Sequence, residues 1–104
     1  MIIENKDSLY LVCLSLVDPY YGFYYDINAI SFYCKRYGIK LVLDLAHSFG
    51  SVPIDLKKWK VDGACICGYK YFCGGPGAPG FVYLNESHFE EEADLTGWMA
   101  KNRN

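Results

Sequence analysis

The chain has 104 residues, enough for at most one small domain, and its composition of 52% hydrophobic and 17% aromatic residues excludes a disordered chain. A formal net charge of −2, without any basic run, argues against nucleic acid as a partner. So much apolar surface exceeds what a chain of this length can enclose, and we therefore expect part of a larger protein.

The first residues do not resemble a targeting segment. Met1, Ile2 and Ile3 are followed at once by acidic and polar residues, whereas a signal peptide has a basic stretch before an apolar one. No apolar run reaches the length of a transmembrane helix. We therefore expect a cytoplasmic protein that does not bind a membrane.

The first half of the chain predicts a strand, a loop and a helix. Residues 9–17, LYLVCLSLV, form a continuous apolar run that is typical of a strand buried on both faces. A turn-rich loop, DPYYGFYYD, follows it. A helix is predicted over residues 27–37, with Asp26 or Asn28 as its N-terminal cap and Gly38 at its end.

The second half predicts further strands. In chain order we expect a buried strand, a short helix and two more strands, over residues 39–46, 54–60, 61–68 and 80–86, before an irregular or partly helical tail. Strands that alternate with helices indicate an α/β fold with a mostly parallel sheet. A single good helix would leave one face of this sheet poorly covered, and exposed apolar surface favours self-association.

Polar residues follow each of the first three predicted strands. In parallel sheets, ligands bind beyond the carboxyl ends of the strands, so these residues are candidates for a site: Ser15, Asp44, His47, Tyr69 and Lys70. A carboxylate inside LVLDLA is expected to be buried, and a buried charge requires a partner. Asp44 could make a local turn hydrogen bond or pair with a bound cation such as a protonated ring nitrogen.

Lys70 lies between an apolar strand and a glycine-rich loop. Taken alone, it could be an ordinary solvated lysine, but this position favours a partly enclosed amine. Desolvation lowers the pKa of a lysine and frees its amine to attack a carbonyl carbon. An aspartate and a lysine at neighbouring strand ends suit pyridoxal phosphate, whose aldehyde bonds to a lysine while an acid pairs with its pyridine nitrogen.

The cysteines and the loop GGPGAPG favour structural roles. The cysteines lack paired ligand spacing, which predicts buried, reduced thiols, with zinc or disulfides as alternatives, at Cys13, Cys34, Cys65, Cys67 and Cys73. We predict no metal site. The loop lacks the signatures of a P-loop and of a Rossmann turn. We therefore interpret it as a tight reversal of the chain, although glycines could also cradle a phosphate.

Three motifs stand out in the second half of the chain: Asp44-Leu45-Ala46-His47, Trp59-Lys60-Val61-Asp62 and Tyr69-Lys70-Tyr71. In these motifs and their spacing, residues 9–98 resemble kynureninase, a member of the broader fold-type-I, class-V family of pyridoxal phosphate enzymes. This resemblance implies that residues 1–104 form part of a large cofactor-binding domain, without the upstream phosphate loop and without the small C-terminal domain.

The resemblance also implies roles for single residues. Lys70 would carry pyridoxal phosphate, and Asp44 would keep the pyridine nitrogen protonated. Tyr69 would contact the cofactor phosphate and donate a proton during catalysis, and His47 would pack beside cofactor and substrate. The resemblance further places two residues near the cofactor, Ser15 and Trp98.

The implied reaction is hydrolysis of the Cβ–Cγ bond of L-kynurenine, or of its 3-hydroxy form, to anthranilate, or its 3-hydroxy form, and L-alanine. The intact protein would be a homodimer. We expect the 104-residue chain alone to bind the cofactor weakly and to be inactive. The alternatives are a non-catalytic remnant or part of another class-V enzyme, such as a cysteine desulfurase.

Overall fold

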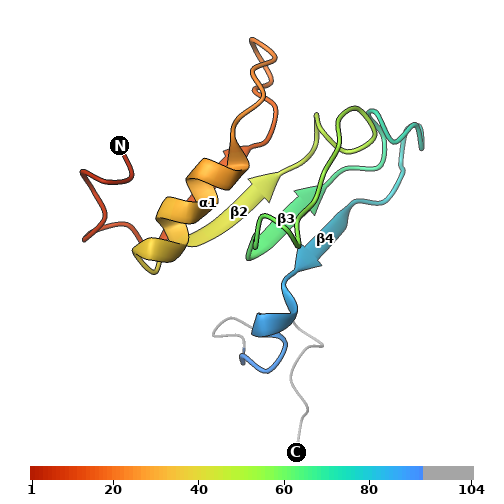
Figure 1. Ribbon diagram of the computed structural model, residues 1–104. Coiled ribbons are helices and arrows are strands. Elements are labelled where there is room, and N and C mark those ends of the chain that lie inside the picture. The colour runs from red at the N-terminus through yellow and green to blue at the C-terminus, as the bar shows by residue number, and fades with distance from the viewer. Residues whose placement is uncertain (93–104) are drawn as a thin grey trace, which may run out of the picture.

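A four-stranded sheet organises residues 1–92, the part of the chain that the computed structural model describes (Figure 1). The strands lie side by side in chain order, and the elements are β1 (Leu11–Ser15), helix α1 (Ile27–Arg36), β2 (Lys40–Asp44), β3 (Gly63–Ile66), β4 (Phe81–Leu84) and the 3-10 turn η1 (Glu86–His88). Strands β1, β2 and β3 are parallel, and β4 runs antiparallel to β3. The predicted α/β fold with a mostly parallel sheet is confirmed.

Hydrogen bonds at its two ends define the limits of helix α1. The side chain of Asp26 accepts a hydrogen bond from the Ala29 amide at 3.1 Å, so the cap is Asp26 and not Asn28. At the other end, the Ile39 amide donates to the Cys34 carbonyl at 2.8 Å just after Gly38. No helix among residues 1–92 is long and apolar enough to cross a membrane.

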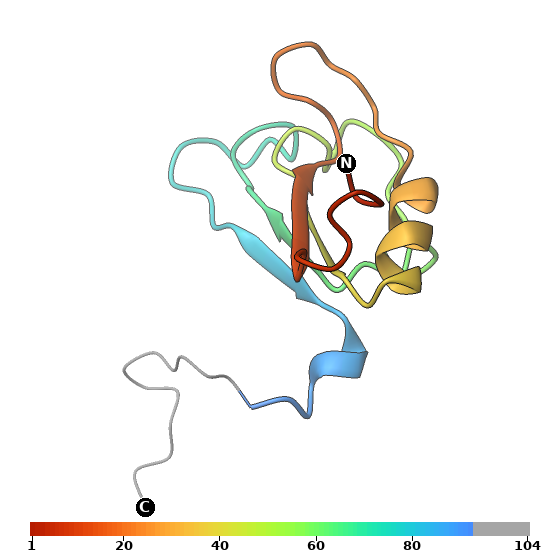
Figure 2. The same cartoon turned by 90° about the vertical axis from the view of Figure 1, so that its left-hand side faces the viewer.

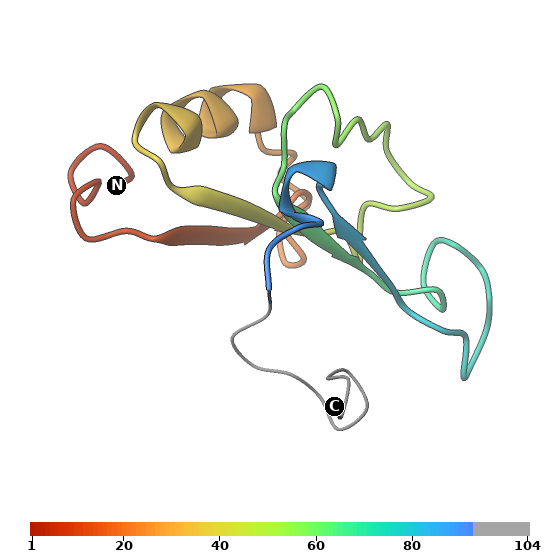
Figure 3. The ribbon, with the colours of Figure 1, turned by 90° about the horizontal axis from the view of Figure 1, so that it is seen from below.

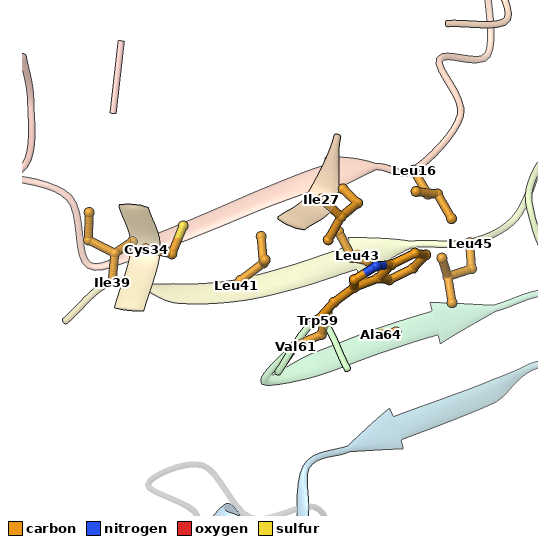
Figure 4. Close-up of a cluster of buried hydrophobic side chains, with 10 residues drawn as sticks. All are labelled: Leu16, Ile27, Cys34, Ile39, Leu41, Leu43, Leu45, Trp59, Val61 and Ala64. Atoms are coloured by element: carbon orange, nitrogen blue, oxygen red, sulfur yellow. The ribbon is translucent and has the colours of Figure 1, made fainter. Parts of the chain in front are cut away.

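The core lies between α1 and one face of the sheet. Ile27 and Cys34 of the helix point toward Leu41 and Leu43 of β2, and the ring of Trp59 covers the region where β2 meets β3 (Figure 4). Leu41 and Leu43 are fully buried. Burying a leucine side chain contributes about 1.5–3 kcal/mol, so this alternating pair is a main attachment point for the helix.

The opposite face of the sheet is uncovered by residues 1–92. Figure 3 shows α1 and the segment after β2 on one side of the strands, with no described helix on the other. Two rows of side chains cross this open face, and the strand register aligns Cys13–Val42–Gly63–Leu84 and Ser15–Asp44–Cys65–Val82. Val82 is 79% exposed. The expectation that one face is poorly covered is confirmed, and burial on both faces of the first two strands is not observed.

Residues 54–60 do not form the predicted helix. They make a single helical turn in which the Trp59 amide donates to the Asp55 carbonyl at 3.0 Å. Lys60 then adopts a left-handed conformation, with φ of 52°, and the Val61 amide donates back to the Leu56 carbonyl. The apolar pattern correctly marked Trp59 as a buried residue. The helical turn nevertheless ends there, because the chain re-enters the sheet at Gly63.

The prediction that the cysteines are buried is wrong for most of them. Among residues 1–92 all are free thiols, but Cys34 alone is buried, Cys67 is half-buried, and the exposed ones are Cys13, Cys65 and Cys73. Cys13 and Cys65 are exposed because they lie in β1 and β3 on the open face of the sheet. Burial raises the pKa of the Cys34 thiol, which keeps this core thiol protonated.

A buried carboxylate holds the amino end of the parallel strands together. Asp62, with 8% of its side chain exposed, accepts from the Leu41 amide at 2.8 Å and pairs with Lys35 at 3.0 Å and His88 at 2.8 Å. Burial opposes ionisation of Asp62, but the hydrogen bonds from Leu41, His88 and Lys35 outweigh it and lower its pKa. The carboxylate thereby joins α1, β2 and η1.

His88 makes the attachment of η1 sensitive to pH. Its two ring nitrogens lie 2.8 Å from carboxylate oxygens of Asp62 and Glu91, and these hydrogen bonds raise its pKa above the ordinary value of 6.5, against the repulsion of Lys40. Because the pKa of His88 is higher in the folded state than in the unfolded state, protonated His88 stabilises the fold. This contribution is complete when the pH lies below the pKa of the unfolded state, and it disappears as the pH rises through the pKa of the folded state.

We expect His88→Gln to remove this dependence. The stability difference between wild type and variant should be greatest below pH 6.5 and should shrink as the pH rises above it. Urea unfolding followed by circular dichroism across this range measures the difference. A difference that stays constant with pH would show that the charge of His88 does not stabilise the fold.

Candidate functional site

The residues that follow the parallel strands meet at one edge of the sheet. Ser15 ends β1 and lies opposite Asp44, which ends β2, and Asp44 in turn lies opposite Cys65 of β3. The segments that leave β1, β2 and β3 project from this same edge (Figure 1), and Figure 2 shows the edge turned by 90°. The prediction that these strand ends come together is confirmed for the residues that the structure describes.

Asp44 is exposed, contrary to the expectation that it is buried. Its side chain belongs to the open face of the sheet, and Oδ1 accepts a hydrogen bond from the Ala46 amide at 2.8 Å. This is the local turn hydrogen bond that the sequence left as one alternative. The other oxygen, Oδ2, has no hydrogen-bond partner among residues 1–92 and is available to a ligand.

Lys70 is half-buried, as predicted, and contacts His47. Its Nζ lies 3.2 Å from His47 Nε2 and 5.8 Å from the centre of the Tyr69 ring. The ring of His47 also faces that of Tyr71, with 6.5 Å between centroids. The turn after β2 and the segment after β3 therefore lie side by side, and the histidine of one meets the lysine of the other.

A hollow of about 380 Å³ joins Asp44 to the lysine-bearing segment. Its walls come from β2, β3 and the segment after each, and its lining residues are Asp44, Ala46, Cys65, Ile66, Cys67, Tyr69, Ala78 and Gly80. Lys70 follows Tyr69 directly in the chain and is not itself a lining residue. The lining combines a carboxylate, a phenol and two thiols with apolar walls.

The loop after Lys70 reverses the chain, as predicted. It carries the chain from β3 into the antiparallel β4, and the Gly74 amide donates to the Gly68 carbonyl at 2.8 Å across its base. A Cβ atom at Gly68 would collide with the Pro79 carbonyl oxygen, and one at Gly74 would lie 2.7 Å from the Ala78 methyl group. Gly68 and Gly74 therefore allow the loop to pack against itself, as a tight reversal of the chain requires.

Two site residues were not predicted from the sequence. Cys65 and Cys67 line the hollow, and the Cys67 thiol donates to the Ala46 carbonyl at 3.6 Å. In the sequence the two cysteines are separated by one residue, and in a strand this spacing places both thiols on the same face. That spacing could have identified them as candidates. Trp98 lies outside the described residues.

Comparison with known proteins defines the family. Residues 3–100 match the family model described as aminotransferase class-V. The chain belongs to this family. Its members use pyridoxal phosphate, and the fold matches the large domain of fold-type-I enzymes.

The chain is similar to several kynureninases, which confirms the resemblance predicted from the motifs. It is 42% identical to kynureninase of Saccharomyces cerevisiae over 101 residues, covering 90% of this chain and 22% of that one. It is 36% identical to kynureninase of Debaryomyces hansenii over 107 residues, covering 97% and 23%. The chain thus spans about a quarter of the length of the curated relatives it matches.

Solved structures show the same arrangement of elements. An apo cysteine desulfurase from Thermococcus onnurineus superposes with a TM-score of 0.72 and 26% identity, over 91% of this chain and 24% of that one. A NifS-like protein from Rickettsia africae gives a TM-score of 0.67 and 31% identity, over 84% and 23%. The sheet edge described above therefore belongs to a recurrent scaffold.

The chemistry of the described residues fits pyridoxal phosphate. Lys70 offers a half-buried amine for an aldehyde, and Asp44 offers an unpaired carboxylate oxygen for a protonated ring nitrogen. The hollow between β2 and the lysine-bearing segment provides apolar walls.

Proposed function

We propose that the chain forms the cofactor-binding part of a kynureninase-type hydrolase, which cleaves the Cβ–Cγ bond of L-kynurenine to give anthranilate and L-alanine. The observation that carries this proposal is the contact between Lys70 and His47, at 3.2 Å, in a chain 36–42% identical to kynureninases. Bound pyridoxal phosphate would supply an electron sink that stabilises negative charge on the substrate.

Lys70 and His47 would handle a proton together. The lysine amine attacks a carbonyl carbon only after it loses its proton, and His47 Nε2 is close enough to accept that proton from Nζ. The same pair can return a proton to Nζ when the lysine is released. Both side chains are half-buried, which limits competition from water.

Asp44 and Tyr69, which both line the hollow, would orient the cofactor. Asp44 Oδ2 would accept a hydrogen bond from the protonated ring nitrogen, while the Ala46 amide holds Oδ1 in place. The Tyr69 side chain is 55% exposed, which leaves its hydroxyl free to contact the phosphate and to donate a proton. Ser15, beside Asp44 in the sheet, would be a further contact.

The proposal extends to partners and location. The substrate would be L-kynurenine or its 3-hydroxy form, and the complete enzyme would be a cytoplasmic homodimer. Exposed apolar residues on the open face, such as Val82 and Leu84, support burial against other protein. We infer that residues 1–104 provide one part of the large domain, because Asp44 and Tyr69 are too exposed here to hold the cofactor tightly.

A second candidate is cysteine desulfuration. It is supported by the likeness to the solved desulfurase and by the two thiols, Cys65 and Cys67, in the wall of the hollow. The two activities differ in their products, since a kynureninase releases anthranilate whereas a desulfurase transfers sulfur from L-cysteine. Assays with both substrates therefore separate them.

The experiment places this chain in a complete scaffold. The matching segment of the Saccharomyces cerevisiae kynureninase is replaced by this chain, and anthranilate release from L-kynurenine is followed by fluorescence. We expect measurable turnover that falls by at least about a hundredfold in the same chimera with His47→Ala, because a proton-transfer group contributes about 10²–10⁴. The 104-residue chain alone should release no measurable anthranilate.

A matched variant, Lys57→Ala, changes an exposed lysine on the turn before β3 and should leave turnover unchanged. A chimera that binds the cofactor but converts L-cysteine and not L-kynurenine would favour the desulfurase. A chimera that binds the cofactor and converts neither substrate would favour a non-catalytic remnant.

A further inference from the structure

We infer that Gly50 is a positioning residue for Lys70, because it lets the lysine-bearing segment lie directly against the turn after β2. This inference rests on the proposed role of Lys70, although its geometry does not. Gly50 does not line the hollow and has no side chain to contact a ligand. Its influence would pass through the backbone of the segment it faces.

The backbone at Gly50 touches the backbone beside Lys70. A Cβ atom at Gly50 would lie 2.6 Å from the Tyr71 carbonyl oxygen and 2.8 Å from its carbonyl carbon. It would also lie 3.2 Å from the Phe72 amide nitrogen. These are backbone atoms, which cannot rotate away as the end of a flexible side chain can. Any larger residue must therefore separate the turn after β2 from the segment that carries Lys70.

Gly50 also has a conformation that other residues avoid. Its φ is +90°, in the left-handed region where a Cβ atom is disfavoured. The close contact and the positive φ make two separate demands at one position. Glycine satisfies both, whereas alanine satisfies neither.

Two side chains that precede Gly50 contact the same segment. Phe49 packs against Phe72 with ring centroids 5.2 Å apart, and His47 reaches Lys70 at 3.2 Å. Phe72 also meets the ring of Phe81 at 6.0 Å, which ties the segment to β4. The turn at residues 47–50 thus packs against residues 70–72, and Gly50 sets how closely the two segments approach each other.

The test measures Lys70 in the chain without any cofactor. Competitive acetylation followed by peptide mass spectrometry gives the reactivity of each lysine, and Lys58, which is exposed, is the internal reference. We expect Gly50→Ala to lower the reactivity of Lys70 relative to Lys58 severalfold, because the amine moves away from His47, which can take its proton. The nitrogen resonances of the His47 ring should shift in the same variant.

The matched control is Gly38→Ala. Gly38 also has a positive φ, of 68°, but a Cβ atom there meets nothing within 4 Å, and it lies at the opposite edge of the sheet. This control carries the backbone strain without the collision, so its lysine ratio should remain at the wild-type value. A folded Gly50→Ala chain with an unchanged ratio would overturn the inference.

If Gly50→Ala does not fold, Phe72→Leu tests the inference in its place. This variant weakens the packing of residues 70–72 without a collision, since it removes the ring contacts to Phe49 and Phe81. We expect a smaller change in the reactivity of Lys70 relative to Lys58, in the same direction. An unchanged ratio would overturn the inference. Because no cofactor or substrate is present, these results are independent of whether the enzyme is a kynureninase.

Discussion

Replacing Lys70 with alanine is expected to abolish specific covalent capture of pyridoxal phosphate by the chain. In wild type, borohydride reduction after incubation with the cofactor should fix it to Lys70 about tenfold more than to Lys58. That ratio corresponds to one additional charge-assisted hydrogen bond of about 1.5 kcal/mol, here donated by the protonated ring nitrogen to Asp44 Oδ2. Peptide mass mapping identifies the modified lysine.

The physical reason for this preference is the surroundings of the amine. Lys70 is half-buried beside His47, which can take its proton, whereas Lys58 is exposed and has no such neighbour among the described residues. Asp44 shares a hollow with Tyr69, the residue before Lys70. Capture should remain weak overall, because the exposed carboxylate also competes with water for the ring nitrogen.

The matched variant for this experiment is Lys58→Ala, which should leave labelling of Lys70 unchanged. A second variant, Asp44→Asn, should lower the preference for Lys70 toward that of an ordinary lysine while the amine itself stays intact. Equal labelling of Lys70 and Lys58 in wild type would show that the sheet edge does not select the cofactor.

Asp62→Ala is expected to lower the free energy of unfolding by about 2–3 kcal/mol. The substitution leaves the buried Leu41 amide without its acceptor, which costs about 1–3 kcal/mol by itself. Loss of the ion pair with Lys35 adds little, because that side chain is 42% exposed and its charge is screened by water. Urea unfolding monitored by circular dichroism gives the value.

The control for Asp62 is Asp7→Ala. Asp7 also pairs with a lysine, Lys6 at 2.8 Å, but its side chain is 90% exposed, so its removal should change stability by less than about 0.5 kcal/mol. A double-mutant cycle with His88→Gln should show coupling, since the two side chains share a hydrogen bond. Additive effects would mean that Asp62 acts through Leu41 and Lys35 alone.

Local patterns predicted the four strands, helix α1 and the residues at the strand ends. Apolar runs marked the strands, Asp26 and Gly38 bounded the helix, and the rule for strand ends selected Ser15, Asp44 and Lys70. These predictions succeed because each depends on neighbours in the chain or on the common direction of parallel strands. The motif around Lys70 then indicated the family, which the comparison with known proteins confirmed.

Distant contacts decided the features that the sequence missed. Whether Asp44 is buried depends on what covers the open face, and no local pattern contains that information. The role of Asp62 depends on Lys35 and His88, each 26 or more positions away along the chain. The turn at residues 54–60 stops short because the chain must re-enter the sheet, which a helical pattern does not reveal.

The sequence by itself therefore determined the α/β fold, the strand-end residues and the family, because these follow from periodicity, capping and motif spacing. Only the tertiary structure decided that His47 meets Lys70, that Asp44 is exposed and that Gly50 must have no side chain. The physical reason is that these properties depend on how segments from separate parts of the chain approach one another.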